Sequence, residues 1–462
     1  MVSAPGRDHS RKNANQPWFG VIGIVILVCS YACIGSVTMA QDTSALPAPV
    51  APNVSLKVDS GDTAWVLISS ALVLAMLMPG LALFYGGLVR TKNVLATIMQ
   101  SVMILSVVSV LWILFGYSLA FGPDKGGVIG GLEWVGLSGV GAEPHPTYGP
   151  TIPHQAFMLF QLMFAAIAPA LITGAFAERK RFTSVVLFGA LWSLVVYVPL
   201  AHWIWGGGWL SKLGALDFAG GAVIHISSGA SALVCAVVLG RRRGYGTDYM
   251  APHNLPMTLL GTGFLWFGWF GFNGGSALGA NAIAVSAILA THAAAAMGAM
   301  AWCGVEWAHR GKPTVLGVAS GAVSGLATVT PAAGYISPLF AIVIGAVAGM
   351  ACYAAIVWKG RFGYDDSLDV VGIHGVGGAI GILATGLCAS KAVNPGGADG
   401  LLFGNPGLFG VQVLVVAVTT MFSMIGTFII LKLVDSMTGL RVSSEEEATG
   451  LDLSQHNERA YS

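Results

Sequence analysis

Apolar residues are grouped in eleven long stretches along this chain, with more polar connections between them. Each stretch approaches the roughly 20 apolar residues that an α-helix needs to cross the hydrocarbon core of a bilayer. The pattern predicts an all-α polytopic membrane protein with eleven transmembrane helices. The predicted segments are residues 64–89, 95–121, 156–176, 184–205, 219–239, 255–274, 280–303, 314–330, 336–358, 370–389 and 408–434.

Basic residues are distributed unevenly over the connections. Connections after odd-numbered segments carry several basic residues each, and connections after even-numbered segments carry few. The first group contains Arg90 and Lys92, Arg179 to Arg181, Arg241 to Arg243, Arg310 and Lys312, and Lys359 and Arg361. The second group contains Lys125, Lys212 and Lys391. Lys and Arg accumulate in the cytoplasmic connections of membrane proteins. The mature N-terminus is therefore predicted to lie outside and the C-terminus in the cytoplasm.

The beginning of the chain has the features of an export signal. A basic start precedes an apolar stretch at residues 19–34, and Thr38-Met39-Ala40 then gives the small-residue spacing typical of a cleavage site. We predict a signal peptide at residues 1–40, followed by a periplasmic segment at residues 41–62. The alternative is an additional, uncleaved membrane helix, although the apolar stretch is short for a span.

Composition narrows the classes of function. Hydrophobic residues make up 55% of the chain and charged residues 9%, a balance that fits a bilayer protein better than a soluble domain. The formal net charge of +1 argues against nucleic acid as a partner. The six cysteines show no CxxC spacing, so we predict that they form neither a metal site nor a redox site.

Two histidines inside apolar segments begin near-copies of one pattern. The sequence after His225 reads HISSGASAL and that after His374 reads HGVGGAIGI, with Gly229 and Gly378 at matching places. The segments are the fifth and the tenth, so they run in opposite directions and predict an inverted 5+5 repeat with a final helix appended. Ionisable residues at membrane depth are costly and usually functional. Chance similarity between helices rich in Gly and Ala is the alternative.

Several longer motifs resemble those of the ammonium transporter (Amt/Mep/Rh) family, in particular its bacterial Amt type. They follow one another in family order over nearly the whole predicted mature chain. They are PGLALFYGGLVRTKNVL (79–95), GAFAERKRF (174–182), AHWIWGGGWL (201–210), GALDFAGGAVIHI (214–226), PHNLP (252–256), GWFGFNGGSA (268–277) and DVVGIHGVGG (369–378). The resemblance implies a multi-pass protein of the bacterial inner membrane that transports ammonium or ammonia, without enzymatic activity or a cofactor. Its membrane domain is expected at residues 63–434.

The resemblance also implies an outer recruitment site for the cation. The family positions match Phe160, Phe164, Trp205 and Ser276. An aromatic face attracts a small cation and a hydroxyl accepts one hydrogen bond, so the residue types suit ammonium. Without the motif, Trp205 is better interpreted as an anchor at the membrane interface.

Below that site, the resemblance implies an apolar gate and a pore lined by the two histidines. The gate positions match Phe164 and Phe272, which on their own are typical of core packing. In a neutral pair such as His225 and His374, one ring nitrogen donates and the other accepts, so the pair is satisfied without water and is able to relay a proton. The alternative for each histidine is a satisfied core residue.

Asp217 lies eight residues before His225, at the start of the fifth segment. The resemblance implies that this carboxylate supports the recruitment site without necessarily contacting the cation. A cap that complements the positive end of the helix dipole is an equally good interpretation. We expect Asp369 to have the corresponding structural role before His374.

Moving a bare cation through an apolar pore carries a penalty of several kcal/mol, which neutral ammonia avoids. The expected mechanism therefore includes deprotonation near the outer gate. The sequence leaves two fates open for the proton: it stays outside, or it crosses separately through the histidines and Asp217. The first predicts silent transport and the second predicts a current.

The predicted cytoplasmic tail at residues 435–462 contains GLRV, TGLD and H-x-E-x-A-Y. These motifs resemble the tail of bacterial ammonium transporters, which packs under neighbouring subunits of a homotrimer and supports regulation by the PII signal protein. Two other functions compete with transport: an ammonium sensor of the same fold, and a membrane redox protein that binds haem between His225 and His374.

Overall fold

The computed structural model describes residues 56–461. The predicted signal peptide at residues 1–40 and most of the predicted segment at residues 41–62 lie outside the described residues. Helices dominate the described part, so the boundaries of the predicted membrane segments can be compared with them directly.

Five helical spans form the first half of the membrane domain. Short π-helical or 3₁₀ segments, both labelled η, interrupt or begin several of them. In chain order the spans are α2, η1 and α3 (Ser60–Ala75, Met76–Leu81, Ala82–Leu88); η2, α4, η3 and α5 (Thr91–Asn93, Val94–Leu111, Trp112–Gly116, Tyr117–Phe121); α6 (His154–Phe176); α7, η5, α8 and α9 (Phe182–Trp192, Ser193–Tyr197, Val198–Ile204, Trp209–Lys212); and η6 with α10 (Gly221–Ile226, Ser227–Leu239).

Six further helical spans complete the membrane domain: α11 (Leu255–Gly275), α12 (Ala282–Arg310), α13 (Val315–Val329), α14 (Pro338–Phe362), η7 with α15 (Val371–Val376, Gly377–Cys388), and α16 (Pro406–Thr438). Ten of the spans in the described part are long and apolar enough to cross a membrane, and α13, with 15 residues, is shorter. The predicted fold class, an all-α multi-pass membrane protein, is confirmed. The number of eleven complete crossings stays a prediction.

The short helix α13 ends beside the loop that precedes the fifth span. A 15-residue α-helix is about 22 Å long, less than the hydrocarbon thickness of a bilayer. Just after it, the carbonyl of Pro331 accepts a hydrogen bond from the N–H of Phe218 at 3.1 Å. The end of α13 therefore helps to hold the loop that precedes η6.

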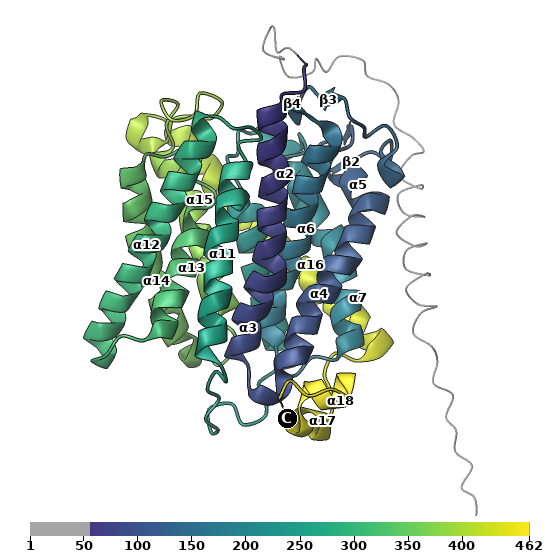
Figure 1. Ribbon diagram of the computed structural model, residues 1–462, viewed down its shortest axis with the longest axis vertical. Coiled ribbons are helices and arrows are strands. Elements are labelled where there is room, and N and C mark those ends of the chain that lie inside the picture. The colour runs from purple at the N-terminus through teal and green to yellow at the C-terminus, as the bar shows by residue number, and fades with distance from the viewer. Residues whose placement is uncertain (1–55, 462) are drawn as a thin grey trace, which may run out of the picture. The chain divides into compact units, whose positions relative to one another are not determined.

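The two ends of the helical bundle have different coverings (Figure 1). At one end, called the hairpin end, β1 (Asp124–Lys125) pairs antiparallel with β2 (Ile129–Gly130), and β3 (Pro144–His145) pairs with β4 (Gly149–Pro153). At the opposite end, called the tail end, lie the C-terminal helices α17 (Ser444–Thr449) and α18 (Leu451–His456). Two further short 3₁₀ segments are η4 (Val135–Leu137) and η8 (Leu401–Phe403).

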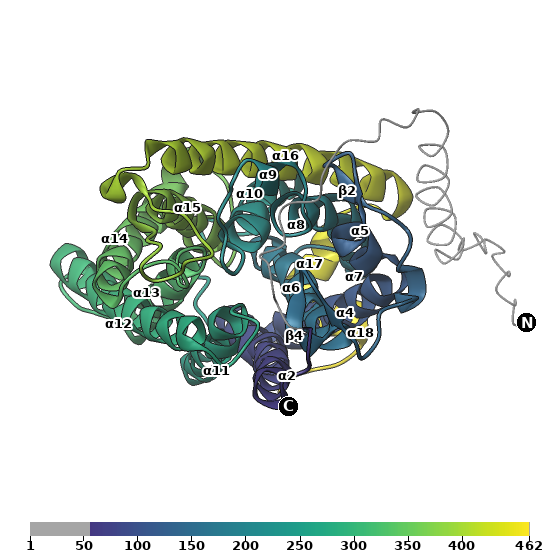
Figure 2. The ribbon, with the colours of Figure 1, turned by 90° about the horizontal axis from the view of Figure 1, so that it is seen from above.

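The long helix α16 lies along one flank of the bundle, where it packs against both α10 and α15 (Figure 2). Several polar groups inside the bundle are paired across helices. The indole N–H of Trp192 donates to Ser231 Oγ at 2.9 Å and to Thr427 Oγ1 at 3.1 Å, and that of Trp269 donates to Thr330 Oγ1 at 2.9 Å. These bonds offset the cost of burying polar atoms in the apolar interior.

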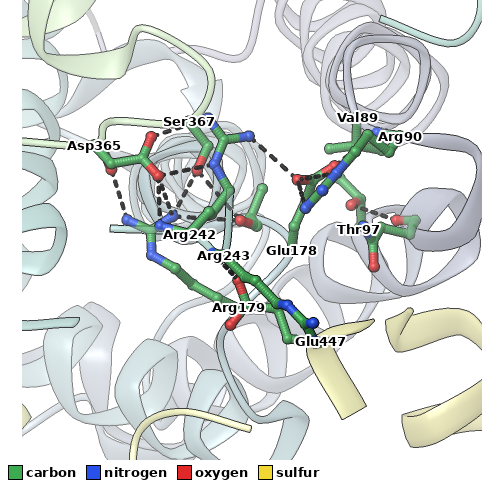
Figure 3. Close-up of polar contacts among 12 residues, drawn as sticks. Val89, Arg90, Thr97, Glu178, Arg179, Arg242, Arg243, Asp365, Ser367 and Glu447 are labelled. Atoms are coloured by element: carbon green, nitrogen blue, oxygen red, sulfur yellow. Dashed lines mark hydrogen bonds and ion pairs between the residues drawn. The ribbon is translucent and has the colours of Figure 1, made fainter. Parts of the chain in front are cut away.

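A cluster of buried ion pairs joins the basic connections at the tail end (Figure 3). Glu178, in the connection after α6, pairs with Arg90 at 2.7 Å and with Arg242 at 3.2 Å. Arg242 also pairs with Asp365 at 2.9 Å. Burial raises the pKa of the Glu178 carboxyl, but Arg242 and Arg90 outweigh burial and hold that pKa below its ordinary value. The cluster thus keeps these charges ionised at neutral pH.

The C-terminal tail is attached to this cluster. Glu447 accepts a hydrogen bond from the backbone N–H of Arg243 at 2.6 Å (Figure 3). It also pairs with Arg441 at 2.7 Å. Lys92 Nζ donates to the carbonyl of Glu447 at 3.0 Å, and Asp452 Oδ1 accepts from the N–H of Ala96 in α4 at 2.8 Å. The tail therefore lies against the connections of its own chain.

Candidate functional site

The two histidines singled out by the sequence lie next to each other in the centre of the bundle. His225 lies in η6 and His374 in η7, and their side chains come from opposite halves of the chain. Their ring centroids are 5.2 Å apart, and the two Nδ1 atoms form a hydrogen bond of 3.2 Å. The residues are 1% and 4% exposed. One ring therefore donates to the other, as the neutral pair requires.

The glycine four residues after each histidine makes this contact possible. A Cβ atom added to Gly229 would lie 2.2 Å from the backbone of Gly375, directly after His374. A Cβ added to Gly378 would lie 2.9 Å from the Cβ of His225. Each glycine thus gives room to the segment that carries the other histidine, an arrangement typical of closely packed membrane helices.

The approach to each histidine is also built alike in the two halves. Gly220 and Asp369 each lie five residues before the histidine, and both have left-handed backbone conformations, with φ of 111° and 64°. In both halves the carbonyl of this residue accepts a hydrogen bond from the residue before the histidine, at 3.0 Å from Ile224 and 3.1 Å from Ile373. Asp369 therefore matches Gly220 and not Asp217.

The residue that corresponds to Asp217 is Asp366, which lies eight residues before His374. Its Oδ2 accepts a hydrogen bond from the N–H of Val371, the first residue of η7, at 2.8 Å. Asp369 instead forms an ion pair with Lys359. The expectation that Asp369 repeats the role of Asp217 is therefore wrong, and a count of eight residues back from each histidine would have found Asp366.

Aromatic rings continue from His225 toward the hairpin end. Trp269 and Phe272 lie beside His225, with ring centroids at 5.6 and 6.2 Å. Phe272 stacks on Phe164 at 4.3 Å, and Phe164 meets Trp205 edge to face at 6.0 Å. Rings in a constriction oppose the passage of a hydrated ion. The two predicted gate residues are thus stacked next to the histidine pair.

A cavity of about 530 Å³ lies on the other side of the stacked rings. Phe164, Trp205, Asp217 and Ser276 all line it. Phe160 does not belong to its lining and is fully buried, with its ring 4.8 Å from that of Phe164. Four of the predicted residues therefore meet at one cavity, and Phe160 packs against Phe164 without lining the cavity.

Hydrogen bonds fix the polar groups of this cavity. The carboxylate of Asp217 accepts four backbone N–H bonds of 2.7–3.2 Å from residues 220–223, where η6 begins. Burial raises the pKa of the Asp217 carboxyl, and these four donors act in the opposite direction. Trp205 Nε1 donates to the Asp217 carbonyl at 2.8 Å, and Ser276 Oγ donates to the Phe272 carbonyl at 2.9 Å. Ser276 thus keeps lone pairs free for a donor in the cavity.

Other cavity residues were not singled out by the sequence. Gln161, Tyr148, Tyr335 and Asn394 also line the cavity. Gln161 directly follows Phe160, so a scan of residues adjacent to the matched motif positions would have identified it. Tyr148 and Asn394 lie in long connections, where helical periodicity gives no signal. Among the described residues, no cluster of three or more His, Cys, Asp or Glu side chains has the arrangement of a metal site.

Cavity, stacked phenylalanines and paired histidines follow one another along the bundle, as expected for the path of a small polar solute. The sequence pattern of the Ammonium Transporter Family matches residues 64–461. The chain belongs to the ammonium transporter family. Accordingly, it transports ammonium or ammonia across a membrane.

Individual proteins of known sequence or structure agree with this assignment. An ammonium transporter from Bacillus subtilis (strain 168) is 52% identical over 402 residues, covering 87% of this chain and 98% of the relative. The crystal structure of Mep2 from Saccharomyces cerevisiae is similar, with a TM-score of 0.78, 36% identity and coverage of 84% of this chain and 88% of that one. A solved structure described as a sensor Amt protein has a TM-score of 0.77 and 28% identity, covering 86% of this chain and 98% of that one.

Proposed function

We propose that transport begins with recruitment of the ammonium cation in the cavity at the hairpin end. Trp205 and Phe164 offer aromatic faces, and Ser276 offers a hydroxyl oxygen with free lone pairs. Asp217 supports the site through the four N–H bonds that order the start of η6, and its negative charge favours a cation nearby. In this scheme Phe160 is a positioning residue behind Phe164.

Deprotonation follows at the stacked rings of Phe164 and Phe272, where the proton passes either back to water on the cavity side or onward to the histidine pair. A charged ion that enters this apolar constriction loses its hydration, whereas neutral ammonia passes at a lower cost. The paired imidazoles of His225 and His374 accept the molecule next. Their direct hydrogen bond also offers a separate route for the proton.

The observation that carries this proposal is the unbroken series of contacts from cavity to histidines. Trp205 contacts Phe164, Phe164 stacks on Phe272, and Phe272 lies beside His225, which bonds to His374. Every predicted pore residue except Phe160 either lines the cavity or belongs to this series.

Currents recorded from proteoliposomes on solid-supported membranes test the proposal. We expect a saturable current after an ammonium step and none after a potassium step. His225→Ala should reduce the ammonium current roughly tenfold or more, because a positioned proton-transfer group is lost. His292→Ala is the matched control: its side chain is exposed and lies beside Trp266, away from the pore.

Two other outcomes have distinct meanings. Internal alkalinisation without current would contradict the histidine proton relay and indicate conduction of neutral ammonia alone. If both the current and the alkalinisation are absent, transport by this chain is contradicted and the ammonium sensor is favoured. The sensor rests on the similarity to a solved sensor Amt protein, which is lower in identity than the transporter from Bacillus subtilis.

We also propose the orientation and location predicted by the basic connections. Arg90, Arg179 and Arg242 gather at the tail end, which supports a cytoplasmic tail and an external hairpin end. Residues 1–40 then form the signal peptide, residues 41–62 a periplasmic segment, and residues 435–462 the cytoplasmic tail of a bacterial inner-membrane protein. Labelling of single introduced cysteines from one side of the membrane tests this topology.

Two partner interactions complete the proposal. The family resemblance supports a homotrimer, and the docked tail offers an ordered cytoplasmic surface at which a PII signal protein would bind. Mass measurement of the protein in detergent tests the trimer. Co-purification with PII, with and without residues 444–461, tests the second interaction.

A further inference from the structure

The recruitment cavity contains an acceptor that has no assigned role. Gln161 lies in α6 between Phe160 and Phe164 and lines the cavity. The residue is only 9% exposed, and its Oε1 has no hydrogen-bond partner among the described residues. A buried amide oxygen without a partner is unusual, because the loss of water is not compensated.

Two polar side chains of the cavity wall already accept hydrogen bonds from the backbone. Both oxygens of Asp217 hold backbone N–H groups, and Asn394 Oδ1 accepts from the N–H of Gly396 at 3.0 Å. Ammonium is a donor with four N–H groups and has no lone pair. Besides the hydroxyl groups of Ser276, Thr147, Tyr148 and Tyr335, the Gln161 carbonyl is a further side-chain acceptor that the cavity wall offers to these donors.

The side chain can present this oxygen to the cavity without a change of helix position. A half turn about the last torsion of glutamine exchanges Oε1 and Nε2, and this torsion has a broad energy profile. A donor-only ion in the cavity favours the orientation in which the oxygen faces it.

We propose that Gln161 is a further substrate-binding residue, whose carbonyl accepts one N–H of the bound cation and favours ammonium over methylated amines. This inference rests on the proposed recruitment site. Aromatic faces such as Trp205 hold a methylated cation as well as ammonium, so they discriminate little. A site that provides an acceptor for each N–H disfavours an analogue in which a methyl group replaces one of them, because the acceptor is left unpaired.

The test measures half-saturating concentrations of ammonium and methylammonium in proteoliposomes. Gln161→Met keeps the length of the side chain and removes its carbonyl. We expect the half-saturating ammonium concentration to rise roughly tenfold, the equivalent of about 1.4 kcal/mol, with little change for methylammonium. Gln161→Glu keeps an oxygen at the same position and should retain the preference for ammonium.

Gln155→Met is the matched control. Gln155 is exposed in the first turn of the same helix, outside the cavity lining, and donates to the Val140 carbonyl at 3.1 Å. This variant should leave both half-saturating concentrations unchanged. Thermal unfolding of each variant separates loss of folding from loss of recognition, and Gln161→Leu, which also lacks the carbonyl, replaces Gln161→Met if that variant does not fold.

The outcomes separate this inference from the proposed function. If the wild type transports ammonium but Gln161→Met changes neither concentration, or raises both equally, Gln161 is structural and the inference fails while transport stands. Loss of the ammonium preference in a folded Gln161→Glu protein would also overturn it. If the wild type transports neither cation, the proposed function and the inference fall together.

Discussion

The two histidine-bearing halves share a backbone plan but differ in their surroundings. Each has an aspartate eight residues before the histidine, a left-handed residue five before it, and a glycine four after it. Asp217 lines a cavity and holds four N–H groups. Asp366 is 1% exposed, and its Oδ1 has no partner in the described part of the chain.

The difference shows which features the repeat determines. Local backbone geometry around each histidine is common to both halves, so it follows from the short motif. A place at the recruitment cavity is not common to both, because Asp217 lines it together with Trp205, Asn394 and Tyr148, and Asp366 does not. An inverted repeat can thus bring two equivalent histidines together while only one of its aspartates lines this cavity.

The largest expected effect comes from filling the contact between the halves. Gly229→Ala should lower the free energy of unfolding by about 3 kcal/mol, because the new Cβ would lie 2.2 Å from the backbone of Gly375. Gly378→Ala should cost less, since its nearest contacts are at 2.9 Å. Thermal unfolding in detergent compares the two. Equal losses of stability in the two variants would mean that both positions tolerate an added Cβ atom to the same degree.

The second comparison replaces the two aspartates. Asp217→Asn puts an amide N–H against backbone donors and should destabilise the protein by roughly 2 kcal/mol, with loss of most ammonium transport. Asp366→Asn should have little effect on transport, because Asp366 has no place at the cavity. Transport assays and unfolding measurements check both variants. Equal loss of transport in the two would contradict the asymmetry.

The pH dependence of Asp366 sharpens this result. Burial raises the pKa of its carboxyl from 3.8 to about 6. The folded protein therefore binds this proton more tightly than the unfolded chain, and the contribution of Asp366 to stability declines as pH rises from about 4 through about 6. The stability of Asp366→Asn relative to the wild type should accordingly increase over that interval in unfolding measurements. A constant difference would show that the carboxyl does not titrate there.

The smallest expected effect concerns the left-handed position. Asp369 has φ of 64°, whereas its equivalent Gly220 pays no steric cost at φ of 111°. Asp369→Gly and Asp369→Asn both remove the ion pair with Lys359, so their difference isolates the backbone. The glycine variant should be more stable, by up to about 1 kcal/mol in unfolding experiments. A more stable asparagine variant would mean that its side chain caps η7 in another way.

Much of the fold could be predicted from the sequence because membrane spans are specified by local composition. The predicted boundaries of the fifth segment, 219–239, and of the sixth, 255–274, agree closely with the helices at Gly221–Leu239 and Leu255–Gly275. The predicted eighth segment, 314–330, likewise differs from α13 at Val315–Val329 by only one residue at each end. A larger difference lies at α12, which continues to Arg310, past the predicted end at residue 303. Hydropathy does not report how far a helix continues beyond its apolar residues.

The candidate site was predictable to a different degree. The repeated pattern around His225 and His374 identified a pair that the structure brings into contact. Phe160 and Asp369 show what a linear motif lacks: the first is near the cavity without lining it, and the second shares a motif without sharing a partner. Which side chain faces a cavity depends on connections far away in the sequence.

The cluster around Glu178 also has a consequence for biosynthesis. Its members come from connections near residues 90, 178, 242 and 365, and Glu447 joins them through Arg243 and Arg441. Because Asp365 and Glu447 lie late in the sequence, these contacts are completed only after most of the chain has been synthesised. The last residues to be synthesised thus hold connections made much earlier, and a chain truncated before Glu447 leaves the backbone N–H of Arg243 without this partner.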